Sequence, residues 1–259
     1  MNKFLEKIKN GKTAVGTHAQ LGSQPIMEMF GIAGFDAVWI DTEHTAIDRQ
    51  DLLNSIIALN GYRTAAIVRI PWNDPVLAKP VLEMGVDGII FPYVRSAQDV
   101  EQAMESCIYP PHGIRGFGPI RANKYGMMGS QEYFDTYLDD TFRIVQIEHV
   151  DAVRCIDDIL KVKYLSGIVL GPNDLSGSLG VLGQTDHPDV QKCFDIVAEA
   201  AKKAGIPFGV STGYSVGSGG GNLKQWTDRG ANYIFVGSDV SYAMSGAAAT
   251  YEEVSNLVR

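Results

Sequence analysis

Short apolar runs rich in Val and Ile recur along the chain, and each is followed by a segment with the residue spacing of a helix. Runs this short and this uniformly apolar are typical of strands buried on both faces of a parallel sheet. The pattern therefore predicts eight buried strands. They are expected at Thr13–Gly16, Ala37–Ile40, Ala65–Ile70, Gly88–Pro92, Arg143–Ile147, Ile168–Leu170, Pro207–Val210 and Tyr233–Val236.

The segments between these runs predict helices, some with recognisable ends. Asp74 and Ser96 stand at expected N-cap positions, and Gly85 and Gly205 stand where a helix should end. Residues 109–140 are expected to form a long connection. Helices are expected at 24–33, 49–59, 74–85, 97–107, 150–160, 189–204, 223–229 and 250–258, and residues 1–11 also carry helical spacing.

Eight strands alternating with helices over 259 residues match the count and length of a (β/α)8 TIM barrel. A doubly wound open sheet is the competing fold, because it also alternates strands and helices. That fold usually carries a glycine fingerprint after its first strand, and residues 16–19, Gly-Thr-His-Ala, do not match GxGxxG. No linker divides the chain, so we expect a single barrel domain over residues 1–259.

Composition excludes some classes of partner. The chain is 45% hydrophobic, with a net charge of −8 and a pI near 5.1, and it has no basic stripe. Nucleic acid is therefore not an expected partner. No run approaches the ~20 apolar residues of a membrane span, and residues 1–11 lack a signal-peptide core. The three cysteines have no CxxC spacing, so we expect free thiols in a cytoplasmic protein.

Acidic and amide side chains follow the fifth and sixth predicted strands. Glu148 lies one residue past the fifth run, Gln146 lies within it, and Asp174 follows the sixth. Oxygen ligands on neighbouring barrel strands suit a hard divalent ion such as Mg²⁺ or Mn²⁺. The alternative is that these carboxylates only cap strand or helix ends. Because the three residues fall together, we favour metal binding by Glu148 and Asp174.

Arg69 and His44 are the candidate catalytic side chains on the early strands. Arg69 closes the third run, where a guanidinium can fork onto a carboxylate or a metal-bound oxygen, although an internal ion pair is the alternative. His44 lies one residue past Glu43 and three past Asp41, and a nearby carboxylate raises the basicity of an imidazole. His18 ends the first run and is a second candidate. His112, His149 and His187 are expected to be structural or surface residues.

Two further features refine this picture. Backbone amides of Asn173 and Asp174 are expected to turn outward after the sixth strand and to hold a substrate carboxylate. No lysine ends any of the eight runs, and a Schiff-base aldolase needs a desolvated lysine in its barrel. That absence favours a metal-dependent route to an enolate.

The ordered set of motifs resembles the class II, metal-dependent 2-keto acid aldolases, of the 2-dehydro-3-deoxyglucarate aldolase and 4-hydroxy-2-oxoheptanedioate aldolase type. The resemblance covers nearly the whole chain. Each motif alone is weak, and their order and spacing carry the assignment. The matching stretches are residues 34–36 (GFD), 40–44 (IDTEH), 68–69 (VR), 72–75 (WNDP), 109–116 (YPPHGIRG), 146–148 (QIE) and 171–176 (GPNDLS).

The resemblance implies reversible cleavage of a 4-hydroxy-2-keto acid to pyruvate, or a related 2-keto acid, and an aldehyde. It implies that Glu148 and Asp174 hold the ion, that Arg69 stabilises the enolate, and that Gln146 supports the same site. It also implies that His44, supported by Asp41, moves protons. A hexamer of dimers that exchange a C-terminal helix is a further implication. The ion, the aldehyde and its stereochemistry stay open.

Some positions leave alternatives open. Asn173 stands where the family often has Ala, so the pocket beside the keto acid is expected to differ. Glycines at 217–221 either bind a phosphate or form a flexible loop, and the loop is the simpler interpretation. Arg115 and Arg121 could reach a distal carboxylate, and Arg115 could instead brace its own loop. Two other functions also stay open: citrate synthase-like condensation of acetyl-CoA with oxaloacetate in siderophore synthesis, and non-catalytic 2-keto acid binding.

Overall fold

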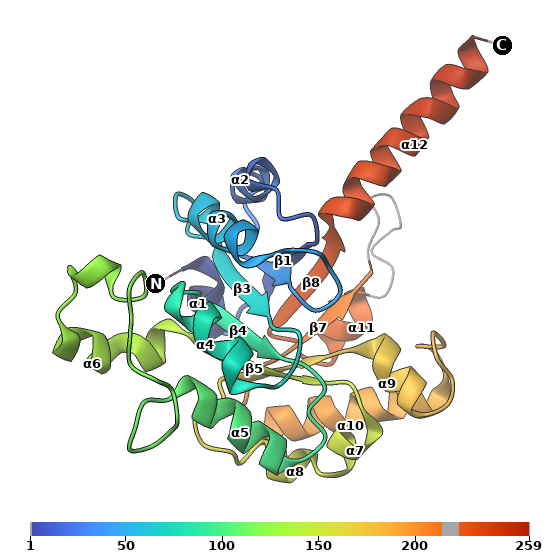
Figure 1. The fold of residues 1–259 in the computed structure, drawn as a ribbon. Helices are drawn as coiled ribbons and strands as arrows, with labels where there is room; N and C mark the ends of the chain where they lie inside the picture. The colour runs from blue at the N-terminus through green and yellow to red at the C-terminus, as the bar shows by residue number, and fades with distance from the viewer. Residues whose placement is uncertain (1, 214–222, 259) are drawn as a thin grey trace.

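A closed parallel barrel forms the centre of the computed structural model, which describes residues 2–213 and 223–258 (Figure 1). Each strand pairs with the next in sequence, and β1 also pairs with β8, which confirms the TIM barrel and excludes the open sheet. The glycine-rich segment 217–221 lies outside the described residues. The strands in this part of the chain are β1 (Ala14–Ala19), β2 (Ala37–Asp41), β3 (Ala65–Arg69), β4 (Gly88–Phe91), β5 (Phe142–Ile147), β6 (Gly167–Leu170), β7 (Phe208–Thr212) and β8 (Tyr233–Ser238).

The helices surround the barrel and mostly begin and end where their cap residues predict. Asp74 and Ser96 do cap helices with their side chains, and Gly205 ends one in the left-handed conformation. The described helices are α1 (Lys3–Lys9), α2 (Gln24–Ala33), α3 (Arg49–Leu59), α4 (Pro75–Glu83), α5 (Ala97–Cys107), α6 (Ser130–Asp140), α7 (Val150–Arg154), α8 (Ile156–Ile159), α9 (Pro172–Ser178), α10 (Pro188–Ala204), α11 (Leu223–Asp228) and α12 (Asp239–Leu257), with a 3₁₀ turn η1 (Lys124–Gly126).

Three expectations for helices were wrong. The connection over 109–140 contains α6 and η1, and the single helix expected at 150–160 is broken at Cys155 into α7 and α8. The C-terminal helix begins at Asp239, well before residue 250, because Ser238 and Ser241 form a capping box at its start. Helix α12 projects away from the barrel (Figure 1), so it carries no continuous apolar face toward a core, and periodicity missed its first half.

Side chains that point into the barrel form a small aromatic core at its amino-terminal end. This interior cluster includes Trp39, Phe142, Tyr233 and Phe235, and α1 adds Phe4, which is 1% exposed. The ring of Phe4 lies edge-on to Phe142 and Tyr233, with centroids 5.5 and 5.4 Å apart. The helix α1 therefore closes the bottom of the barrel.

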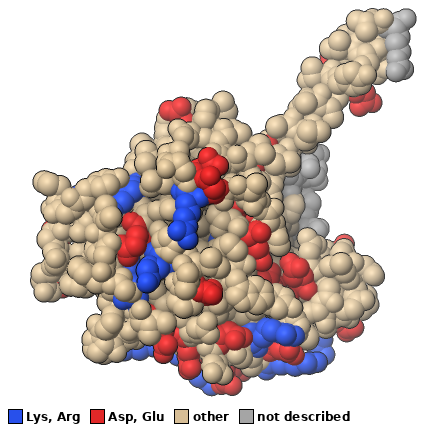
Figure 2. All heavy atoms as spheres, in the orientation of Figure 1, with Lys and Arg blue, Asp and Glu red and all other residues tan. Residues whose placement is uncertain are grey.

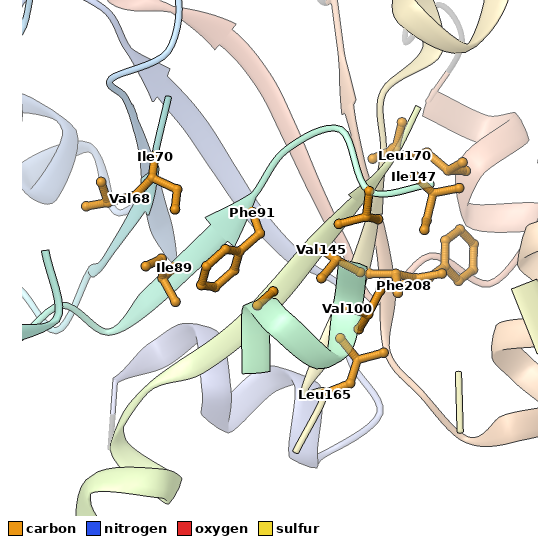
Figure 3. Close-up of a cluster of buried hydrophobic side chains, with 14 of the residues drawn as sticks. Val68, Ile70, Ile89, Phe91, Val100, Val145, Ile147, Leu165, Leu170 and Phe208 are labelled. Atoms are coloured by element: carbon orange, nitrogen blue, oxygen red, sulfur yellow. The ribbon is translucent and has the colours of Figure 1, made fainter. Parts of the chain in front are cut away.

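Side chains on the outer face of the strands form the larger core beneath the helices. Figure 3 shows part of this layer, in which Val68 and Val145 of the barrel belong to the same buried cluster as Val100 of α5. Because side chains alternate between the two faces of a strand, Val68 and Val145 leave their neighbours Arg69 and Gln146 to the interior. In residues 2–213 and 223–258 we find no helix with the length and hydropathy needed to span a bilayer.

Candidate active site

The polar residues of the site continue the interior face of the strands beyond the aromatic core. Trp39 and Ile67 belong to the interior cluster, and Asp41 and Arg69 stand two residues further along the same strands. Strand β2 pairs with β3 so that Asp41 is directly opposite Arg69. The strand period of two thus places both side chains in the barrel at its carboxyl end.

Arg69 and Asp41 form a two-pronged ion pair. The Arg69 Nε donates to Oδ1 of Asp41 at 3.0 Å, and Nη2 donates to Oδ2 at 2.7 Å. Burial opposes ionisation of Asp41, but the bonds and charge of Arg69 outweigh it and hold the pKa of that carboxyl below its ordinary value. The guanidinium also lies over the ring of Trp39, 5.2 Å from its centroid. These contacts fix the direction of Arg69.

Glu43, the residue before His44 in the sequence, joins this group. Its Oε2 lies 3.0 Å from Nη1 of Arg69 and 3.8 Å from Nε2 of His44. Burial raises the pKa of Glu43 against the opposing charge of Arg69. The imidazole of His44 therefore has Glu43 as its carboxylate neighbour, whereas Asp41 accepts from the backbone amide of His44 at 3.5 Å. The His44 side chain is 63% exposed, so it is open to a substrate.

Glu148 is a buried carboxylate whose two oxygens are each held by one donor. The backbone amide of Tyr93 donates to Oε1 at 2.7 Å, and Nε2 of Gln146 donates to Oε2 at 2.5 Å. Glu148 is 3% exposed. Burial raises its pKa to about 8, and the charges of Asp174 and Glu43 act in the same direction. This carboxylate lacks a nearby positive charge strong enough to offset its burial.

Asp174 lies in the first turn of α9. The residue before that helix, Gly171, packs closely against the side chain of Glu148. Gly171 caps that helix, and a Cβ there would lie 2.8 Å from both Gln146 Nε2 and Glu148 Oε2, so only glycine fits. The predicted turn at Gly171–Asp174 is thus the start of a helix. Asn173 lines a cavity of about 200 Å³, and both it and Asp174 are exposed.

A metal ion fits this donor set. Among the described residues there is no group of three or more His, Cys, Asp and Glu side chains arranged as metal ligands. If an ion were held by the two carboxylates Glu148 and Asp174 alone, coordination positions would remain for substrate and water. The Oε1 atom of Gln146 is buried without a hydrogen-bond partner in the described part of the chain, and the raised pKa of Glu148 would be offset by a cation.

The remaining candidates have structural roles. His18 is partly buried, with Nδ1 2.8 Å from the Gly237 carbonyl and Nε2 2.9 Å from the Ser211 hydroxyl, and desolvation lowers its pKa. Both of its ring nitrogens are therefore engaged by residues of β8 and β7. His149 and His187 cap α7 and α10 with their side chains, as structural residues would.

Arg115 and Arg121 lie away from Glu148 and Asp174, and for Arg115 the contacts support the alternative in which it braces its loop. Arg115 pairs with Glu83 at 3.0 Å and lies over Tyr109, which braces the loop, and Arg121 binds the carbonyls of Met84 and Gly85. Both line a cavity of about 590 Å³ near the start of β4, the amino-terminal side of the barrel. That cavity is larger than the one beside Asn173, but neither Glu148 nor Asp174 lines it.

The sequence did not indicate the roles of Tyr93 and Gly171. It placed Glu43 beside His44 but did not indicate its ion pair with Arg69. Gly171 follows a buried strand, where glycine often marks close backbone approach. The contribution of Tyr93 is a backbone amide, which no side-chain pattern reveals.

Comparison with known proteins assigns the family. The family model described as HpcH/HpaI aldolase/citrate lyase matches residues 15–245. This chain belongs to that family of aldolases and lyases. A 5-keto-4-deoxy-D-glucarate aldolase from Escherichia coli is 33% identical over 240 residues, covering 92% of this chain and 91% of the relative.

Solved structures agree with this assignment. The HpcH/HpaI aldolase from Desulfitobacterium hafniense DCB-2 is 29% identical with a TM-score of 0.90, covering 98% of this chain and 97% of that one. Citrate synthase SbnG is 27% identical with a TM-score of 0.81, covering 97% and 98%. The citrate lyase beta subunit from M. tuberculosis, complexed with oxaloacetate and magnesium, is 15% identical with a TM-score of 0.56, covering 86% and 91%, and shares the fold alone.

Proposed function

We propose that this chain is a divalent-metal-dependent aldolase that reversibly cleaves a 4-hydroxy-2-keto acid to pyruvate, or a related 2-keto acid, and an aldehyde. The observation that carries the proposal is Glu148, a carboxylate that is 3% exposed and held by two donors beside the charge of Asp174. An arrangement that raises the pKa of a carboxyl to about 8 is costly for stability and is typical of functional sites.

Glu148 and Asp174 are the residues that would hold Mg²⁺ or Mn²⁺. When bound, the ion would act as a Lewis acid on the carboxylate and keto oxygens of the substrate and favour the enolate. Gln146 would keep Glu148 oriented through its amide, and its own Oε1 is buried without a hydrogen-bond partner among the described residues. The magnesium reported for the distant citrate lyase beta subunit supports the choice of ion.

Arg69 would bind the keto oxygen and stabilise the negative charge that develops there. A guanidinium has five N–H donors. Two of them bond to Asp41, and Nη1 forms an ion pair with Glu43 at 3.0 Å, so the N–H groups that do not bond to Asp41 remain for the substrate. Because the pair of carboxylates fixes the guanidinium before the substrate arrives, little reorganisation is needed in the transition state.

His44, oriented by Glu43, would remove the hydroxyl proton during cleavage and return it during synthesis. In the cleavage direction the C4 hydroxyl loses its proton to the base, the C3–C4 bond breaks, and its electron pair becomes the enolate of the keto acid. The exposed imidazole can then exchange that proton with solvent.

The activity test uses pyruvate alone and then an acceptor. With Mg²⁺ or Mn²⁺, the protein should exchange the methyl protons of pyruvate for deuterium, measured by proton NMR, and should form aldol product when an aldehyde is added. Cleavage of 5-keto-4-deoxy-D-glucarate, the substrate class named for the Escherichia coli relative, is the first natural reaction to assay. Full exchange in excess EDTA would overturn the metal-dependent mechanism.

Citrate synthase-like condensation of acetyl-CoA with oxaloacetate is a second candidate function. The TM-score of 0.81 with citrate synthase SbnG is the observation that favours it. Incubation with both substrates and a thiol reagent tests it, because condensation releases free CoA. Thiol release without any aldol product would make this the better assignment. Keto acid binding without methyl proton exchange would instead support a non-catalytic binding protein.

We also propose that the chain forms a homo-oligomer through α12, in the manner of a helix exchanged between subunits. Along this helix Met244, Tyr251, Val254 and Leu257 are exposed. Figure 2 shows the projecting helix as almost entirely uncharged, in contrast to the mixed charges on the barrel face in view. Sedimentation of the full chain and of Met244→Glu tests this, and a wild-type monomer would contradict it. A hexamer is the expected state.

A further inference from the structure

Tyr93 carries the one hydrogen bond that the backbone gives to Glu148 in the described residues, and it does so from a strained conformation. It follows β4 with φ of 56°, in the left-handed region that residues other than glycine rarely adopt. In this conformation its amide donates to Glu148 Oε1 at 2.7 Å. A strained residue in contact with a catalytic carboxylate requires support from its surroundings.

That support comes from the side chain, which packs among three neighbours at the carboxyl end of the barrel. The Tyr93 ring lies 5.5 Å from the Trp72 ring at an interplanar angle of 31°, and 5.9 Å from the His149 ring. The Arg95 guanidinium lies over the same ring, 5.6 Å from its centroid. We call Trp72, Tyr93, Arg95 and His149 the aromatic shelf. Its members come from the loops that follow β3, β4 and β5.

The shelf is both fixed and accessible. Arg95 Nη2 lies 2.7 Å from His149 Nε2 and 3.3 Å from an oxygen of Asp151, so its charge is already compensated. Trp72 is 54% exposed and Tyr93 is 39% exposed, which leaves ring surface open to solvent on the residue whose amide contacts Glu148 and on its neighbour. An open, charge-compensated pair of rings favours a flat apolar group over an anion.

We propose that the aromatic shelf binds the aldehyde partner and selects aldehydes that carry an aromatic ring. The inference rests on the proposed aldolase function and names the acceptor class for that site. In the synthetic direction, the enolate carbon of the keto acid attacks the aldehyde carbon, the new C–C bond forms, and the aldehyde oxygen takes up a proton. The ring of the acceptor packs against the exposed surface of Trp72 and Tyr93 while its carbonyl faces the enolate.

The test compares kcat/KM for benzaldehyde with kcat/KM for propanal, both with pyruvate and Mg²⁺. Trp72→Leu removes one ring. Tyr93→Gly removes the other but tolerates the left-handed backbone, so the amide bond to Glu148 is retained. Each change should lower the benzaldehyde-to-propanal ratio about tenfold, because one aromatic stacking contact is lost. The loss should be in KM for benzaldehyde.

Tyr125→Gly is the matched control. Tyr125 is also an exposed tyrosine with φ of 56°, but it lies in η1, on the far cavity that Arg115 lines. Its substitution should leave the ratio unchanged. Equal losses for both aldehydes in the Trp72 and Tyr93 variants would mean that the rings only stabilise the site, and an unchanged ratio would mean that no acceptor binds there. Either result overturns the proposal, as does a preference for carboxylate-bearing aldehydes that depends on Arg95.

A binding measurement separates this inference from the aldolase reaction itself. Trp39 and Trp226 are 1% and 2% exposed, so quenching by an unreactive aromatic alcohol should report mainly on Trp72. Saturable quenching by benzyl alcohol that disappears in Trp72→Leu supports the shelf even if no turnover is found. If the wild-type protein shows no pyruvate methyl exchange, the proposed function is overturned. If it shows exchange but no quenching by benzyl alcohol, only the proposal for the aromatic shelf is overturned.

Discussion

The two ends of the barrel interior are built from the same strands, but one end is a packed aromatic core and the other is a cluster of polar side chains. At the amino-terminal end, Phe4 packs against Phe142 and Tyr233, and the Tyr233 hydroxyl is satisfied by the Ile168 carbonyl. At the carboxyl end, Gln146 keeps a buried oxygen without a described partner. Strand β5 contributes to both ends, with Phe142 and Gln146 separated by four residues, or about 13 Å.

The comparison teaches that this fold separates stability from chemistry along each strand. The aromatic end gains free energy from buried rings. The polar end contains Glu148, whose pKa burial raises to about 8. Ionising this buried carboxyl costs free energy unless a cation lies beside it. Substitutions at the two ends should therefore change different measured quantities.

The largest effect on stability is expected from Phe4→Ala. Removing a buried ring should lower the free energy of unfolding by about 3–5 kcal/mol, because a cavity opens among Phe142, Tyr233 and Phe235. Urea denaturation measures this, and kcat per folded molecule should stay at the wild-type value. Met127→Ala, at a residue that is 87% exposed, is the control. A Phe4→Ala variant with a lower kcat and an unchanged free energy of unfolding would contradict the separation of stability from chemistry between the two ends.

Arg69→Ala should have the complementary effect at the other end. Loss of the guanidinium should raise the barrier by roughly 3–4 kcal/mol, or about a hundredfold to a thousandfold in kcat. Arg69→Lys should recover part of that rate, because the charge returns without the two-pronged bond to Asp41. Pyruvate exchange and aldol cleavage measure both variants. A rate for Arg69→Ala within threefold of wild type would exclude this role.

His44→Ala should slow pyruvate methyl exchange about a hundredfold while Mn²⁺ affinity is kept, since in the proposed mechanism the imidazole moves protons without binding the ion. Mn²⁺ titration followed by electron paramagnetic resonance measures affinity independently of turnover. His112→Ala, an exposed histidine in the 109–129 connection, serves as the comparison. If His44→Ala loses the ion, the histidine is a ligand and the assignment is wrong.

The pH dependence of the metal-free protein should reveal the cost of Glu148. A carboxyl with a raised pKa favours folding while protonated, so its contribution is present below 4.5 and is lost as pH rises through about 8. Between those values the free energy of unfolding of wild type should fall relative to Glu148→Gln, by at most about 1.4 kcal/mol per pH unit. Chemical denaturation at several pH values measures this. Parallel curves would show that Glu148 titrates normally.

The sequence predicted the strands well because their apolar runs and flanking caps are local signals. Asp41, Arg69 and Gln146 could be placed in the barrel because each continues a period of two from an apolar interior residue. The same period of two, continued one position beyond the end of β5, also places Glu148 on the interior face.

Other parts could not be predicted because their causes are not local. The bond from Tyr93 to Glu148 joins residues 55 positions apart and depends on a left-handed backbone that Trp72 and Arg95 support. The loop roles of Arg115 and Arg121 depend on which end of the barrel their connection covers. The first half of α12 has no packed face, so it left no periodic signal.

The most direct test of the account compares wild type with Glu148→Gln and Asp174→Asn, each titrated with Mn²⁺ and then given pyruvate in deuterium oxide. The account predicts that each substitution weakens Mn²⁺ binding by at least about tenfold and abolishes measurable methyl exchange, because each carboxylate is a ligand of the ion that favours the enolate. Wild-type Mn²⁺ affinity in both variants, together with undiminished exchange, would contradict it.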